Sequence, residues 1–156
     1  MATILNTIGQ NATATQAGLV TLNKWQRKFL PSNITVSTTD ISSLRFSNLV
    51  VGKVYAVSGQ SIVNGNAAGS AFYNGSFAAI HNGVVIALTD NVYVSLPQQT
   101  NHYLALNRAV FVAAATTVTF NFGHSNMNLY GDGTTAGTYV QIEELNNYEQ
   151  TASSSF

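Results

Sequence analysis

Residues 77–88 decide the fold class, and they read Phe77-Ala78-Ala79-Ile80-His81-Asn82-Gly83-Val84-Val85-Ile86-Ala87-Leu88. Two apolar runs flank an Asn-Gly pair, and these two residue types best tolerate the positive φ of a two-residue hairpin turn. The pattern predicts two antiparallel strands joined at residues 82–83. His81 lies beside this turn, and we expect its imidazole to lie at the surface.

The rest of the chain repeats this pattern of short β-type runs and turn residues. Val118, Phe120 and Phe122 alternate with polar residues, as in a strand with one buried face, and no helical period persists for ten residues. Turns are expected at residues 64–65, 74–75, 82–83 and 131–133. Strands are expected at 24–30, 34–37, 43–50, 53–62, 71–80, 84–89, 91–95, 102–106, 109–114, 117–122 and 138–145. This spacing predicts an all-β, antiparallel two-sheet jelly-roll sandwich.

The ends of the chain differ from this body. We expect an extended N-terminal arm at 1–23, the jelly-roll domain at 24–148 and a flexible tail at 149–156. A disordered leader and an arm that orders only on a neighbouring subunit fit the first segment equally well. In the second case its aliphatic residues would form the partner-docking arm, namely Ile4, Leu5, Ile8, Leu19 and Leu22.

Composition narrows the classes of partner. Hydrophobic residues make up 46% of the chain and charged residues only 8%, and six Lys and Arg balance six Asp and Glu. Without an excess of positive charge we expect neither a nucleic acid nor a membrane as partner. Cysteine is absent, which excludes disulfides and thiolate metal sites, and no export signal is expected from the first residues.

Residues suited to catalysis are few and scattered. His124-Ser125 with Asp132 lacks the G-x-S-x-G setting of a nucleophile elbow, and the adjacent Glu143 and Glu144 should point to opposite faces of a strand. His102 precedes an expected strand, and no metal-ligand or phosphate-loop spacing occurs. We therefore expect no enzyme activity, no metal and no cofactor.

Aromatic residues suggest a surface for self-association. Any one Tyr on a strand is more often a core or border residue, but Tyr is also enriched where an apolar surface meets water at an interface. As a set, these rings favour a seam between subunits. The candidate oligomer-interface residues are Trp25, Tyr55, Tyr93, Tyr103 and Tyr139.

Three stretches resemble a known family. Residues 46–60, which include Asn48-Leu49-Val50-Val51-Gly52-Lys53-Val54-Tyr55, residues 131–145 and residues 25–28 are similar to segments of bacteriophage virion and tail-fibre head domains with a tumour-necrosis-factor-like jelly roll. The resemblance implies a homotrimer packed around a three-fold axis, located in a virion. It implies no catalytic residue.

Two roles follow from this resemblance. Fibre heads usually follow a long shaft, whereas only about 23 residues precede the first expected strand, so we favour a capsid decoration (cement) protein that binds the major capsid protein or other virion proteins. The alternative is a phage tail or tail-fibre head that binds a host receptor or glycan. That role would use the loops at 64–70 and 124–135.

Overall fold

The computed structural model describes residues 24–65, 72–89, 92–95 and 101–145. The expected arm at 1–23 and the expected tail at 149–156 lie outside these residues. The described residues form nine strands: β1 (Trp25–Phe29), β2 (Val54–Gly65), β3 (Phe72–His81), β4 (Val84–Leu88), β5 (Val92–Ser95), β6 (His102–Val112), β7 (Val118–Ser125), β8 (Met127–Leu129) and β9 (Tyr139–Leu145).

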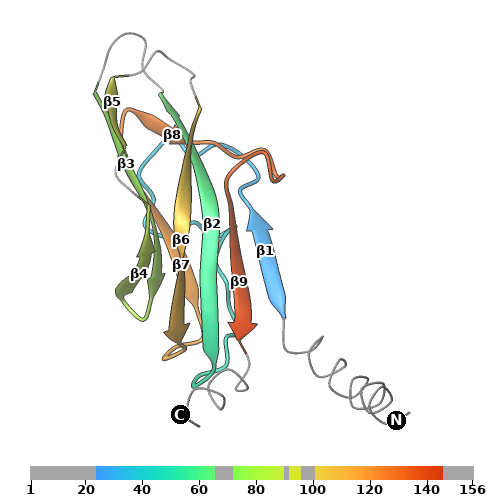
Figure 1. Ribbon diagram of the computed structural model, residues 1–156. Helices are drawn as coiled ribbons and strands as arrows, with labels where there is room; N and C mark the ends of the chain where they lie inside the picture. Colours follow the sequence, from blue (N-terminus) through green and yellow to red (C-terminus); the bar gives the residue numbers. More distant parts are fainter. Residues whose placement is uncertain (1–23, 66–71, 90–91, 96–100, 146–156) are drawn as a thin grey trace, which may run out of the picture.

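The strands form two antiparallel sheets that pack face to face (Figure 1). The five-stranded sheet has the order β1-β9-β2-β6, with β8 paired to β2, and the four-stranded sheet has the order β4-β3-β5, with β7 paired to β3. The chain crosses between the sheets after β2, β5, β6 and β7, so strands that pair, such as β2 with β6 and β9, are often not neighbours in sequence. The predicted all-β jelly-roll sandwich is confirmed.

Aromatic side chains fill the space between the sheets. Phe77 and Phe120 stack with ring centroids 5.7 Å apart, and Phe46 meets Phe120 edge-on at 6.0 Å. Phe120 and Phe122 of β7 are buried with Val118, as their alternation predicts. Each large ring removes about 150–250 Å² from water, so these residues dominate the core.

The predicted hairpin at residues 82–83 is also confirmed. Asn82 and Gly83 both have positive φ, 49° and 77°, and join β3 to β4. The expectation of a surface imidazole at His81 is wrong, because that side chain is only 5% exposed. Alternation along β3 places His81 on the same inward side as Phe77 and Ala79.

Several other expectations need correction. The segments 34–37 and 43–50 are not strands, and pair with the sheets only through isolated bridges at Ile34, Thr38 and Phe46. A turn interrupts them, in which Leu44 N donates to Ile41 O at 2.9 Å. The expected turn at residues 74–75 lies inside β3, and the expected strands 102–106 and 109–114 are one strand, β6.

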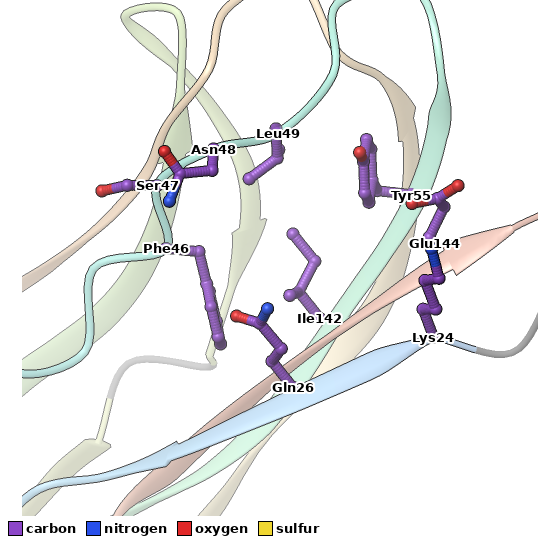
Figure 2. A pocket seen from close by; sticks show the side chains of 9 residues that line it. All are labelled: Lys24, Gln26, Phe46, Ser47, Asn48, Leu49, Tyr55, Ile142 and Glu144. Carbon is purple, nitrogen blue, oxygen red and sulfur yellow. The ribbon is translucent and has the colours of Figure 1, made fainter. Parts of the chain in front are cut away.

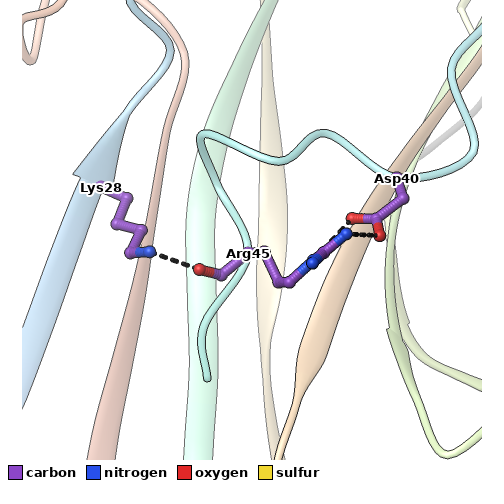
Figure 3. Close-up of polar contacts among 3 residues, drawn as sticks. All are labelled: Lys28, Asp40 and Arg45. Carbon is purple, nitrogen blue, oxygen red and sulfur yellow. Dashed lines mark hydrogen bonds and ion pairs between the residues drawn. The ribbon is translucent and has the colours of Figure 1, made fainter. Parts of the chain in front are cut away.

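The segment around residues 38–46 closes one side of the sandwich. Lys28 of β1 donates a hydrogen bond to the carbonyl oxygen of Arg45, and the Arg45 guanidinium pairs with Asp40 (Figure 3). The Lys28 ammonium also lies 5.5 Å from the centre of the Phe46 ring. These contacts hold the segment against β1 and cover part of the core.

Candidate functional site

The outward side of the five-stranded sheet is the candidate functional surface. In antiparallel pairs, directly opposite residues share a face of the sheet. Val54 of β2 lies opposite Val112 of β6 and Leu145 of β9, and Ala56 lies opposite Val110 and Glu143. We call this surface the outer face, and its main residues are Trp25, Arg27, Phe29, Val54, Ala56, Gln60, Tyr103, Val110, Val112, Tyr139, Gln141, Glu143 and Leu145.

Large apolar side chains of the outer face are open to solvent. The exposed fractions are 54% for Val110, 57% for Val112, 57% for Trp25 and 63% for Tyr103. Single exposed apolar residues are common on soluble proteins, but a patch that continues across neighbouring strands marks an interaction surface. On the outer face, the exposed apolar side chains lie on the two outermost strands, β1 and β6, on either side of the buried Val54 and Ala56 of β2.

An aromatic and cationic cluster occupies the β1 side of the outer face. The Arg27 guanidinium lies 5.5 Å from the Trp25 ring centre and 4.8 Å from the Tyr139 ring centre. Arg27 Nη2 also donates to Gln141 Oε1 at 2.6 Å, and the Phe29 ring lies 6.4 Å from that of Tyr139. Cation–π and hydrogen-bond contacts thus fix these side chains in one arrangement, which is what a preformed interface needs.

An ion pair crosses the middle of the outer face. Arg108 Nη2 of β6 lies 3.8 Å from Glu143 Oε2 of β9, on the far side of β2. The two side chains reach across β2, whose outward residues at this level, Ala56 and Ser58, have short side chains. The outer face therefore displays both signs of charge within a mainly apolar surface.

A second apolar surface adjoins the first. β4 is an end strand of the four-stranded sheet, and its Val84, Val85 and Leu88 are 62%, 53% and 48% exposed. β4 contacts β6, and the His81 ring at the end of β3 lies 4.7 Å from the Phe111 ring of β6. We call this surface the β4 edge; it lies next to the strand that bears Val110 and Val112.

Three asparagines form a row at one end of the outer face. Asn128 Nδ2 of β8 donates to Asn64 Oδ1 of β2 at 3.1 Å, and Asn64 Nδ2 donates to Asn101 Oδ1 at 3.1 Å. Asn64 follows Ile62 by two residues, and Ile62 lies opposite Tyr103 of the outer face. We call these three residues the amide row.

Of the five aromatic residues predicted for an oligomer interface, three lie on the outer face: Trp25, Tyr103 and Tyr139. Tyr55 requires a correction, because it is 6% exposed and stacks on Phe111 inside the sandwich, where its hydroxyl accepts a hydrogen bond from Val50 N at 3.0 Å. A ring used in the subunit core is not available at an interface. The side chain of Tyr93 and the arm residues Ile4, Leu5, Ile8, Leu19 and Leu22 lie outside what the structure describes.

A small pocket opens between β1, β2, β9 and residues 46–49 (Figure 2). Phe46, Leu49 and Ile142 supply apolar walls, and Lys24 and Glu144 are among its polar lining. A hydrogen bond to Glu144 raises the pKa of Lys53 above its usual value. The cavity measures about 110 Å³, whereas pockets for drug-sized ligands measure about 300–1,000 Å³. It is too small for such a ligand.

The residues considered for hydrolysis have local structural partners. His124 Nδ1 accepts a hydrogen bond from Met127 N at 3.3 Å, and Asp132 Oδ1 accepts hydrogen bonds from Thr134 N and Oγ1 at 2.8 and 2.9 Å. Burial lowers the pKa of His124, and a hydrogen bond with the Val36 backbone opposes this only in part. Among the described residues, no three His, Asp or Glu side chains are grouped so that they could hold a metal ion.

No protein-family model matches the chain, and a search of curated proteins finds no match. Solved structures give weak likenesses. A structure of infectious bursal disease virus, Gt strain, has a TM-score of 0.42 and 12% identity over 80% of this chain, which spans only 38% of that viral chain. Eiger TNF from S. frugiperda has a TM-score of 0.42 and 8% identity, covering 76% of this chain and 94% of its own.

The C-terminal domain of EclA, a sugar-binding protein, has a TM-score of 0.35 and 12% identity, covering 80% of this chain and 76% of its own. Scores and identities at this level carry no function over to this chain. In the described residues, no helix has the length and apolar character needed to cross a membrane.

Proposed function

We propose that this chain is a non-enzymatic structural protein that assembles with copies of itself through the outer face. The observation that carries the proposal is the exposure of Trp25, Tyr103, Val110 and Val112 on one side of one sheet. Covering these side chains removes apolar surface from water, which is the main favourable term in protein association. The paired Arg108 and Glu143 allow a partner surface of either sign, including a copy of the same surface.

The oligomer we propose is a trimer with a head-to-tail interface. A closed ring of three subunits needs two different surfaces on each subunit, whereas a two-fold dimer needs only one self-complementary surface. The outer face and the β4 edge are two such surfaces, and β6 lies between them. The β4 edge of one subunit would cover the outer face of the next. We take three as the number of subunits from the resemblance to trimeric head domains.

In this proposal, the trimer is a decoration protein that binds to the outside of a bacteriophage capsid. Residues 1–23 would act as an arm that docks on the major capsid protein, with aliphatic anchors such as Leu19 and Leu22. One short arm binds weakly, but three arms on one trimer raise the effective concentration and hence the avidity.

Trp25 offers a direct test of the assembly, because it is the single tryptophan of the chain and is 57% exposed in the subunit. Light scattering on the purified protein should give the mass of three chains, about 50 kDa from a subunit mass of 16.6 kDa. On dilution, the fluorescence maximum of Trp25 should move to longer wavelength as the mass falls. A monomer at all concentrations would contradict the proposal.

The arm is tested separately. A chain that lacks residues 1–22 should keep its trimer mass and fail to bind capsid shells, and substitution of Leu19 and Leu22 by Ser should weaken binding in the full chain. Unchanged occupancy on capsids would contradict decoration through the arm but leave the trimer intact.

A receptor- or glycan-binding tail-fibre head is the second candidate, favoured by the exposed Trp25 ring beside Arg27 and Gln141. Exposed aromatic rings suit stacking against a planar or apolar ligand face. In this case Trp25 would stay exposed in the oligomer and its emission would respond to a glycan. Labelling of the particle on the shell and not on the tail, with no glycan bound on an array, would reject this candidate.

A further inference from the structure

We infer that the amide row of Asn64, Asn101 and Asn128 is a polar layer that sets the register and the number of subunits in the oligomer. This inference rests on the proposed function, since it takes the outer face to be the interface between copies. The amide row lies on that surface, at the opposite end from Val110 and Val112. The outer face is thus aliphatic at one end and carries amides at the other.

The two hydrogen bonds of the amide row point in the same direction along it. Each hydrogen bond runs from β8 towards β6, from Asn128 to Asn64 and from Asn64 to Asn101. An amide N–H group therefore remains at the exposed Asn101 end, while Asn128 Oδ1 is buried and has no hydrogen-bond partner. Within the described part of the chain, the row offers a donor on its β6 side and lacks a donor on its β8 side.

These two ends suit a head-to-tail ring. The β6 side of one subunit faces the β8 and β9 side of the next, so the free N–H of Asn101 approaches the unsatisfied end of another amide row. A small shift of the Asn128 side chain on assembly opens Oδ1 to this donor, and the rows then join into a closed layer of hydrogen bonds. Buried side-chain acceptors are rarely left without a partner in native proteins, and this layer would provide one.

Such a layer selects among possible assemblies. Apolar side chains of similar size pack acceptably in several registers, but an amide placed against valine in a dry interface loses its hydrogen bonds. A buried Asn fixes register and oligomer state in coiled coils by this mechanism, at a cost in stability. Only the trimer register would align the three rows.

The test is the substitution Asn64→Leu, which removes the middle of the row. Asn121→Leu is the matched control, because Asn121 is also a half-buried strand residue with an unpartnered Oδ1, but lies on the outward side of the four-stranded sheet. Native mass spectrometry and sedimentation should show one trimer species for the wild type and the control. Asn64→Leu should associate at least as tightly but populate dimers, tetramers or larger species at a tenth or more of the total.

The outcomes separate the two proposals. A single trimer for Asn64→Leu overturns the role of the amide row and leaves the trimer standing, whereas a monomeric wild type overturns both. If Asn64→Leu does not fold, as judged by circular dichroism, the exposed Asn101→Leu replaces it. A homogeneous Asn101→Leu trimer would then reject the inference, and a mixture of species would support it.

Discussion

The two sheets of this sandwich are alike inside and differ outside. Both turn large apolar side chains towards the core, such as Val57 and Ile142 from one sheet and Phe77 and Phe120 from the other. Outward, the four-stranded sheet carries short or polar residues along much of β3 and β7, among them Ser76, Ala78, Thr119 and Asn121, and its exposed apolar side chains lie on the β4 edge. The five-stranded sheet instead carries Trp25, Tyr103, Val110 and Val112 on its outward side. Packing of the core explains why both sheets turn apolar side chains inward. It does not explain the exposed valines and aromatic residues on the outward side of the five-stranded sheet.

The polar residues of the two sheets also differ in the contacts that they make. In the four-stranded sheet they stabilise the subunit itself: Thr89 Oγ1 accepts a hydrogen bond from Phe77 N at 3.0 Å, and His81 holds Ala114 and Thr117. On the outer face, Arg108 pairs with Glu143, and the residues of the amide row form hydrogen bonds with one another. The difference indicates that the four-stranded sheet, apart from its β4 edge, completes the fold, whereas the outer face fits the proposed assembly.

The largest effect is expected from a charge placed in the outer face. Val110→Asp should leave the subunit folded, since Val110 is 54% exposed, but should weaken association at least about 100-fold because an unpaired carboxylate would be buried between subunits. Sedimentation velocity over a concentration series measures this change. Val36→Asp is the matched control, because Val36 is 66% exposed and lies outside the five-stranded sheet. Equal dissociation in both variants would show that the outer face is not the interface.

The sequence predicts local features of this fold better than its outer face. Asn82-Gly83 specifies its hairpin through backbone preference alone, but residues 34–46 pair with β7 and β8 across a long separation that no local pattern encodes. Tyr55 is predicted for an interface because Tyr is enriched where an apolar surface meets water, but β2 is apolar on both sides, so alternation does not tell its inward from its outward residues. Its burial is set by the neighbouring strands.

The outward valines were missed for a specific reason. Leu104 and Leu106 point into the core, so simple alternation along β6 would also turn Val110 and Val112 inward. A bulge places two residues of β6, Asn107 and Arg108, opposite Ser58 alone, and this shifts the alternation by one residue. A one-residue insertion in the register is not visible in the sequence.

A smaller effect is expected from the buried imidazole of the four-stranded sheet. His81 Nδ1 lies 2.8 Å from Thr117 O, and Ala114 N donates to Nε2 at 2.9 Å, which requires the neutral tautomer with the proton on Nδ1. His81→Leu should lower the free energy of unfolding by about 2 kcal/mol, because it leaves these backbone groups unsatisfied. Urea denaturation measures this loss.

His102→Leu is the control for that measurement, since His102 Nε2 has no hydrogen-bond partner among the described residues. It should change the free energy of unfolding by less than about 1 kcal/mol. The trimer mass should stay the same in the His81 variant. Dissociation without loss of subunit stability would show that His81 itself takes part in assembly.

The smallest effect is a pH dependence from His124. Burial lowers the pKa of its imidazole in the folded chain below the ordinary value of 6.5, so between the folded and unfolded pKa values the unfolded chain binds more protons. Stability should therefore be constant above about pH 6.5 and fall as the pH decreases below it. Because this side chain is only partly buried, the loss should stay below about 1 kcal/mol. Urea denaturation at pH 7.5 and 5.5 should show a weaker pH dependence for His124→Asn than for the wild type, and an equal dependence would assign the effect to other groups.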